Sequence, residues 1–193
     1  MKVSKKTLIN IFLIALVVSF FVTPLGYHGK VFLNSLFSFS PDITTRAEST
    51  QIENYNWQLK DPDWNFFSFE QSEGRVVYIN FWASWRLPCA AELASIDKLY
   101  EKYKGEVDFY IVTNEEREPV EEFMAENKIL WKQYFDGKSW GNEIAAEYGI
   151  KGIPATFLIG KEGKIVATDL RGPELEIAIR KELGLPELKP EEP

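Results

Sequence analysis

Residues 76–89 read VVYINFWASWRLPC, and the fold prediction starts from this stretch. Its first seven residues are almost all β-branched or aromatic, which is typical of a strand buried on both faces. Pro88 then stands where the first turn of a helix tolerates proline. From Cys89 onward apolar residues recur at helical spacing, until Gly105 ends the pattern. The stretch therefore predicts the central strand of a sheet that leads directly into a helix.

Strand and helix patterns alternate on both sides of this stretch. Before it, two short strand patterns flank a turn at residues 61–63, which predicts a hairpin over residues 57–69. Residues 160–163 are typical of a second hairpin turn and match a phosphate-binding loop only weakly. The other expected elements are strands at 107–113, 155–159 and 164–168, and helices at 88–103, 119–127, 142–148 and 174–183. This order predicts an α/β fold around one mixed sheet.

The N-terminal region differs from the rest of the chain. Lysines precede an apolar run at residues 8–22 that extends to about residue 27, close to the ~20 residues that a bilayer-crossing helix needs. No small-residue cleavage site follows, so we expect an uncleaved anchor, with a removed signal peptide as the alternative. The position of the lysines places the N-terminus in the cytoplasm and the remainder outside.

The region between anchor and domain is expected to have two parts. Within residues 28–54, an apolar segment comes first, which either lies on the membrane surface or packs on the domain. A polar linker then follows it. We expect the folded domain at residues 55–185 and a charged tail at residues 186–193.

Charge and composition exclude several classes of function. Residues 51–193 carry 17 basic and 27 acidic side chains, a net charge of −10, which disfavours a nucleic-acid partner. The chain has one cysteine, Cys89, and one histidine, His28. It therefore lacks an intramolecular disulfide, a Cys-His pair within the domain and an ordinary zinc site. No motif predicts a cofactor or a metal.

Two segments resemble a known family. Residues 82–89, WASWRLPC, resemble the thioredoxin-fold active-site turn W-A-S-W-C-x-P-C, and residues 149–159, GIKGIPATFLI, resemble the segment that carries the cis-proline of that fold. Over about residues 57–183 the chain is similar to the TlpA/ResA branch of membrane-anchored thiol:disulfide oxidoreductases. The resemblance implies a thioredoxin-like three-layer fold, in which helices flank a central mixed sheet that an N-terminal hairpin extends. It also implies a domain on the periplasmic or extracytoplasmic side of the cytoplasmic membrane.

The chain departs from this family at the residue on which the family's chemistry depends. In the family, the first cysteine of C-x-P-C attacks the substrate disulfide and the second resolves the mixed disulfide. Arg86 stands at the attacking position, and Cys89 matches only the resolving one. Because a guanidinium stays protonated and is no nucleophile, one chain cannot perform dithiol turnover by this route. We expect Cys89 to be a semi-buried, inert thiol; the alternatives are a one-thiol reaction and peroxiredoxin-like peroxide chemistry.

Two further polar residues match positions of the family's site. Glu92 matches an acid three residues after the second cysteine, and the resemblance implies that this partly buried carboxylate has a raised pKa and transfers protons. The other interpretation is a carboxylate paired with Arg86 or with a nearby lysine. Asn80 stands where cytoplasmic thioredoxins carry a buried acid.

The resemblance also implies a groove for a peptide. The bond between Ile153 and Pro154 is expected to be cis, beside backbone that pairs with an extended substrate segment by strand addition. Trp85 is the expected aromatic contact at the rim of this groove, whereas Trp82 is expected in the core.

Two functions from different classes follow. The first is a redox-silent binding module at the membrane, which presents Trp85, Arg86 and Pro154 to an extended polypeptide or protein partner. The second is a thiol:disulfide oxidoreductase that works in a one-thiol mode through Cys89. We favour the binding module, because the attacking cysteine is missing.

Overall fold

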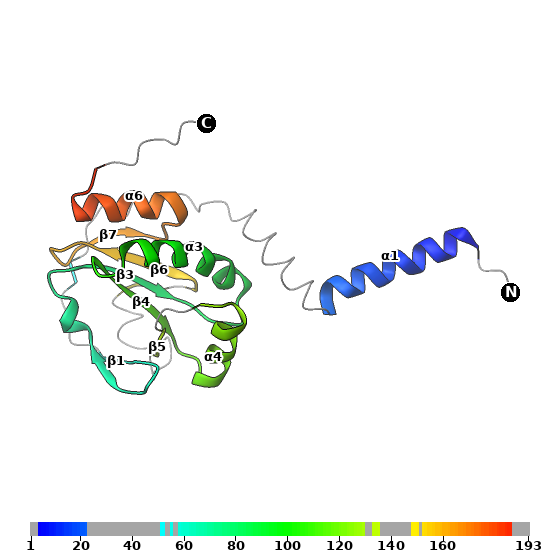
Figure 1. Ribbon diagram of the computed structural model, residues 1–193, viewed down its shortest axis with the longest axis horizontal. Helices are drawn as coiled ribbons and strands as arrows, with labels where there is room; N and C mark the ends of the chain where they lie inside the picture. The colour runs from blue at the N-terminus through cyan, green and yellow to red at the C-terminus, as the bar shows by residue number, and fades with distance from the viewer. Residues whose placement is uncertain are drawn as a thin grey trace. The chain divides into compact units, whose positions relative to one another are not determined.

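The computed structural model describes residues 4–22, 51–52, 55, 58–129, 133–135, 148–150 and 152–186. The chain divides into two compact units, Met1–Phe39 and Ser40–Pro193. In the first unit the described structure is one helix, α1 (Lys5–Val22). All the other described elements belong to the second unit, which is the domain that carries the candidate site (Figure 1).

Helix α1 exposes apolar side chains. Seven large ones between Leu8 and Leu16 each expose more than half of their surface. Among the helices of the described residues, none combines the length and the apolarity that crossing a membrane requires. Residues 23–27 of the expected anchor lie outside the described residues, so the anchor stays a prediction.

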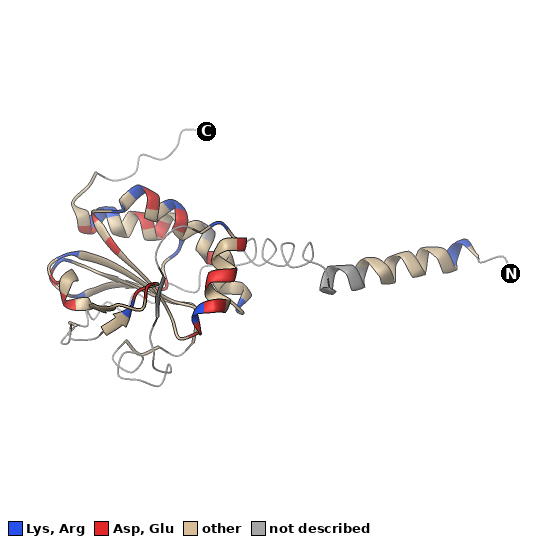
Figure 2. Ribbon diagram, turned by 60° about the horizontal axis from the view of Figure 1, so that its bottom comes forward, with Lys and Arg blue, Asp and Glu red and all other residues tan. Residues whose placement is uncertain are grey.

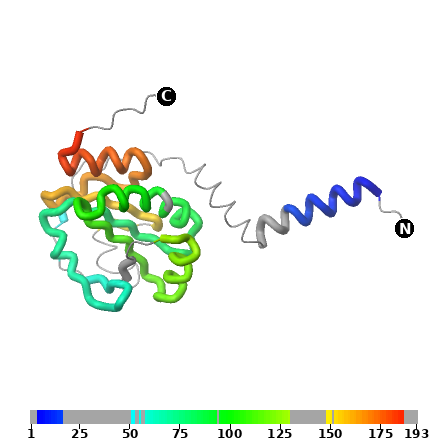
Figure 3. The backbone as a smooth tube through the Cα atoms, viewed as in Figure 1, coloured from blue at the N-terminus to red at the C-terminus, as the bar shows by residue number. Residues whose placement is uncertain are grey.

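A mixed sheet forms the centre of the domain. In the described part of the chain it has seven strands, in the order β2-β1-β5-β4-β3-β6-β7. The strands are β1 (Gln58–Lys60), β2 (Phe66–Ser68), β3 (Val76–Phe81), β4 (Val107–Thr113), β5 (Gln133–Phe135), β6 (Ala155–Ile159) and β7 (Ile165–Thr168). Strands β3, β4 and β5 are parallel, and the remaining neighbours are antiparallel. The two expected hairpins, β1–β2 and β6–β7, form the opposite edges of the sheet (Figure 3).

The helices begin and end where the sequence predicts, within a few residues. Helix α3 (Leu87–Tyr103) has Pro88 in its first turn, and α4 (Arg117–Glu126) begins two residues before its predicted start. Helix α6 (Gly172–Leu183) ends at Gly184, whose φ of 72° lies in the left-handed region that glycine adopts at low cost. The predicted hairpin turn at residues 160–163 is confirmed, because Gly163 N–H donates to the carbonyl of Gly160 at 2.9 Å.

Some parts of the domain differ from the sequence prediction. Strand β5 was not predicted, and a short 3-10 helix, η1 (Phe69–Ser72), follows β2 directly. The domain also includes residues before its expected start near residue 55, since the N–H of buried Ile52 donates to the carbonyl of Gly163 at 2.9 Å. The helix expected at residues 142–148 lies almost entirely outside the described residues.

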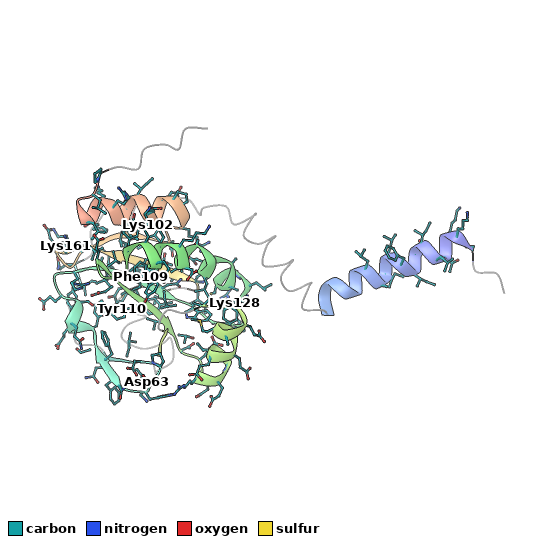
Figure 4. All side chains as sticks on the ribbon, in the orientation of Figure 1. Asp63, Lys102, Phe109, Tyr110, Lys128 and Lys161 are labelled. Atoms are coloured by element: carbon teal, nitrogen blue, oxygen red, sulfur yellow. The ribbon has the colours of Figure 1, made fainter. Side chains whose placement is uncertain are left out.

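Each face of the sheet has its own apolar core. Neighbouring residues of β4, Phe109 and Tyr110, belong to different cores (Figure 4). The core of Phe109 includes residues of α3, α4 and α6, and the core of Tyr110, on the opposite face, includes Leu59, Phe69 and Tyr148. The fold is therefore the expected mixed α/β arrangement with a central sheet and flanking helices. The described helices α3, α4 and α6 supply residues to the first core, and the third expected layer falls on residues outside the described ones.

Candidate functional site

The candidate site lies at one end of the sheet, where β3 ends and β6 begins. The last residue pair between these strands joins Phe81 to Ala155. The turn at residues 82–86 follows Phe81, and Pro154 precedes Ala155. The two segments that resemble the family's site are therefore adjacent, although they are far apart in the sequence.

The turn after β3 has a buried and an exposed tryptophan. The N–H of Trp82 donates to the carbonyl of Val112 on the neighbouring parallel strand, at 3.0 Å. The Trp82 side chain has 0% of its surface exposed, as expected for a core residue, whereas Trp85 exposes 70%. The N–H of Arg86 donates to the carbonyl of Ala83 at 3.2 Å and closes the turn.

Glu115 fixes this turn, and the sequence analysis missed it. The carboxylate accepts the Ser84 N–H at 2.6 Å and the Ser84 hydroxyl at 2.7 Å. The Thr113 hydroxyl also donates to this carboxylate, at 3.3 Å. One signal was available: Glu115 follows the strand pattern at 107–113 by two residues, and parallel strands bring their carboxyl ends to one edge of a sheet.

Arg86 occupies the family's nucleophile position at the start of α3. It is the N-cap residue of this helix, in extended backbone with φ −96° and ψ 113°, and its side chain makes no capping hydrogen bond. Its guanidinium carbon lies 5.6 Å from the centre of the Trp85 ring, within the range of a cation–π contact. The two side chains thus form one half-exposed surface.

Cys89 is more buried than the semi-buried position expected for it. It has 0% of its surface exposed and lies in the first turn of α3. Burial raises the pKa of its thiol to about 11, and the charge of Glu92 acts in the same direction. The backbone of Ala83 and the charges of Arg86 and Arg171 lower the pKa by less than burial raises it. At neutral pH only about one thiol in ten thousand is then a thiolate.

Glu92 is a buried carboxylate that is paired with an unexpected partner. Burial raises its pKa to about 7, with a further increase from Asp169, while Arg171 acts against this shift. The Nε atom of Arg171 lies 3.3 Å from Oε1 of Glu92. The partner is therefore neither Arg86 nor a lysine but an arginine that precedes α6, which the sequence alone did not connect to Glu92.

Asn80 and Tyr78 are two further buried polar residues, on the central strand β3. Both lie on β3 two residues apart, so their side chains share a face of the sheet. Both are completely buried, and the Asn80 side chain lowers the pKa of Tyr78 by less than burial raises it. Burial raises the pKa of Tyr78 well above its ordinary value, and the charge of Glu92 raises it further. The Asn80 amide carries no titratable proton, in contrast to the buried acid that cytoplasmic thioredoxins have at this position.

The second segment of the site contains the predicted proline. The Ile153–Pro154 peptide bond is cis, as expected. Both residues are half-buried, and Ile153 packs against both cores of the domain. Thr156 N–H donates to Asp169 at 3.3 Å, which joins β6 to the segment that carries Arg171.

Comparison with known proteins assigns the family. The Redoxin family model matches residues 56–180. The chain belongs to the redoxin family. One relative is ResA, a thiol-disulfide oxidoreductase of Bacillus thuringiensis, which is 29% identical over 63% of this chain and 71% of the relative. Another is the sporulation thiol-disulfide oxidoreductase A of Bacillus subtilis, which is 31% identical over 51% of this chain and 61% of the relative. The thioredoxin domain of a Bacteroides vulgatus thiol-disulfide oxidoreductase aligns with a TM-score of 0.59 and 29% identity, over 66% of this chain and 92% of that domain. These similarities identify a thioredoxin-fold redoxin of the ResA type.

This redoxin retains the scaffold of the site but has one cysteine. Reduction of a substrate disulfide by a C-x-P-C pair takes two electrons from two thiols and leaves an internal disulfide. Cys89 is the single cysteine of the chain, so that internal disulfide has no second partner. At this site the Trp85 indole is exposed, and the half-buried Arg86 side chain lies against it.

A separate cavity lies at the other end of β4. Its volume is about 500 Å³, and its lining includes Arg75, Asp108 and Ser72. Asp108 accepts hydrogen bonds from Arg75 Nε and from Ser72 Oγ, both at 2.7 Å. These polar groups satisfy one another, and the cavity is not part of the candidate site.

Proposed function

We propose that this redoxin is a membrane-anchored, extracytoplasmic binding protein without dithiol turnover. It holds an extended polypeptide on the surface that Trp85, Arg86 and Pro154 form. The contrast between two side chains carries the proposal: Cys89 is buried with a thiol pKa of about 11, whereas Trp85 exposes 70% of its surface. The Cys89 thiol is therefore inaccessible to a substrate, whereas the Trp85 side chain is available for contact with a partner.

Peptide binding at this surface needs no sulfur chemistry. In the family that the chain resembles, backbone beside the cis-proline pairs with an extended segment, and main-chain hydrogen bonds supply affinity. Tryptophan and arginine are the residues that most often dominate binding energy at protein interfaces. Trp85 and Arg86 contact each other at the rim of the same end of the sheet as Pro154.

Membrane anchoring is supported by the N-terminal sequence and by α1. The apolar side chains between Leu8 and Leu16 are exposed, and a helix that is apolar all round needs an apolar environment. Apolar residues continue beyond Val22, and lysines stand before the run. By the positive-inside rule the domain lies on the extracytoplasmic side.

A second candidate function is a one-thiol oxidoreductase reaction through Cys89. Glu92 favours it, because a carboxylate with a pKa of about 7 whose charge acts on a thiol is suited to proton transfer near neutral pH. In this reaction the Cys89 thiolate would attack a partner's disulfide, which forms a mixed disulfide and releases the partner's other sulfur as a thiol. An external thiol would then attack the mixed disulfide and free Cys89. Peroxide chemistry has weaker support, since it needs a thiolate and the Cys89 pKa is raised.

Two measurements on the purified full chain test the proposal. Insulin reduction with dithiothreitol is compared between the wild type and Cys89→Ser, and the binding of extended peptides is compared between the wild type and Trp85→Ala. We expect the wild type and Cys89→Ser to reduce insulin at equal rates. We expect Trp85→Ala to bind the peptides more weakly than the wild type. Turnover by the wild type that disappears in Cys89→Ser would establish the one-thiol enzyme instead.

A further inference from the structure

We propose that Arg86 makes this site selective for extended polypeptides that carry an aspartate or glutamate side chain. The proposal rests on the proposed function and specifies the chemistry of the partner. The position at which the family attacks a substrate sulfur would here bind a carboxylate.

The first observation concerns the partners of the arginines. In the described domain, Arg75, Arg117 and Arg171 each lie within ion-pair distance of a carboxylate. Arg180 donates to the carbonyl of Pro186 at 2.7 Å. Among the described residues, no carboxylate lies within 4.0 Å of the Arg86 guanidinium, whose one recorded contact is the Trp85 ring.

The second observation is that two acidic residues of the site, Glu115 and Glu92, already have partners. The Glu115 carboxylate accepts both the N–H and the hydroxyl of Ser84. The Glu92 carboxylate is paired with Arg171, and its raised pKa of about 7 reduces its negative charge near neutral pH. Neither of them lies within ion-pair distance of Arg86, so in the described part of the chain its positive charge has no carboxylate partner.

Arg86 is a positively charged residue in a domain whose net charge is negative. Acidic and basic residues are spread along the helices of the domain, and α4 alone carries Glu118, Glu121, Glu122 and Glu126 (Figure 2). The net charge of −10 over residues 51–193 repels acidic partners in general. A carboxylate that binds here therefore depends on a local cation, and binding should be lost when that cation is removed.

The geometry of Arg86 suits a carboxylate ligand. A guanidinium presents its N–H groups at its edge in a planar fork, which matches the two oxygens of a carboxylate. Contact with the Trp85 ring, at 5.6 Å from centroid to Cζ, restricts the arginine without using its hydrogen-bond donors. Arg86 also stands at the N-terminal end of the 17-residue helix α3, where the helix dipole favours negative charge.

An array of immobilised decapeptides tests the proposal. The peptides of the main set are acetylated and amidated, and they share β-prone neutral sequences in which each position in turn is Asp, Glu, Asn, Gln, Cys or Lys. A further set has no acidic side chain and a free C-terminal carboxylate. The full-length protein is applied as the wild type, as Arg86→Gln and as Arg117→Gln, a control that changes net charge equally at an arginine on α4.

We expect the wild type and Arg117→Gln to bind the Asp and Glu peptides about fivefold more tightly than the Asn and Gln peptides, the size of an exposed ion pair. Arg86→Gln should bind both kinds equally, and high salt should remove the preference from the wild type.

Each contrary outcome has a defined meaning. Equal binding of acid and amide peptides by the wild type, or a preference that survives in Arg86→Gln, overturns the carboxylate proposal and leaves peptide binding intact. Binding only to free C-termini overturns the side-chain assignment. Absence of binding to every peptide overturns the proposed function as well.

Discussion

Glu115 accepts two hydrogen bonds from Ser84, one from its main-chain N–H at 2.6 Å and one from its hydroxyl at 2.7 Å. The carboxylate comes from just beyond β4, and the serine comes from the turn just beyond β3. The contact therefore ties together the carboxyl ends of two parallel strands. Because Trp85 and Arg86 follow Ser84 directly, the contact positions the proposed binding surface.

Removing this carboxylate should destabilise the domain. We expect Glu115→Ala to lower the free energy of unfolding by about 1–3 kcal/mol, since it leaves the half-buried Ser84 donors without their charged acceptor. Urea unfolding measures the difference. Glu116→Ala is the matched control, because Glu116 is an exposed neighbour whose side chain makes no capping hydrogen bond. Equal stability of the two variants would show that the Glu115 contact contributes little.

The thiol of Cys89 should resist alkylation in the folded protein. With no exposed surface and a pKa of about 11, it is protonated and shielded at neutral pH. At neutral pH we expect a maleimide probe to label it only after unfolding in urea. Mass spectrometry after timed labelling measures this. Complete native labelling within minutes at neutral pH would contradict the burial of Cys89.

Glu92 should make the stability of the domain depend on pH. Its pKa is raised from 4.5 to about 7 in the folded state, so the folded protein holds this proton more tightly than the unfolded chain. The free energy of unfolding should therefore fall as the pH rises from 4.5 to about 7, and should change little above that range. The full shift corresponds to about 3 kcal/mol.

The matched variants isolate this effect. Glu92→Gln should remove most of the decrease between these pH values, whereas Glu126→Gln, at an exposed position of α4, should keep it. Chemical unfolding over a series of buffers gives both curves. A slope in Glu92→Gln as steep as in the wild type would assign the pH dependence to other groups.

Restoring the missing cysteine should restore dithiol chemistry. Arg86→Cys recreates C-x-P-C at the start of α3, where Cys89 N–H donates to the carbonyl of residue 86 at 3.0 Å. We expect this variant to form an internal disulfide and to reduce insulin, while Arg86→Ser does neither. Thiol titration and the insulin assay measure the two properties. If no disulfide forms, the local geometry has diverged along with the residue, and the family's mechanism no longer applies to Glu92 or Pro154.

The proposed topology predicts the protease sensitivity of the domain. If the N-terminal segment anchors the chain and the domain lies outside, protease added to intact spheroplasts should remove residues 55–185. Immunoblotting against the domain measures the loss, and a cytoplasmic protein that stays intact is the control. Protection of the domain until the cells are lysed would contradict the topology.

The local elements of this domain could be predicted because each has its own signal. The run at residues 76–81 is buried on both faces, and its composition predicts that burial. Pro88 and Gly184 mark the ends of two helices through their backbone preferences. Strand β5 has no such signal, since its three residues form a strand by pairing with β4 and β1.

For the site, the sequence by itself determined the number of cysteines and the identity of the residue at the attacking position. One cysteine and Arg86 exclude an internal disulfide in any conformation. The tertiary structure alone decided which groups act on them: Arg171 pairs with Glu92, Glu115 holds Ser84, and burial shifts two pKa values. Contacts between distant residues and the desolvation of a side chain depend on how strands and helices pack in space, so they exist only in the folded chain.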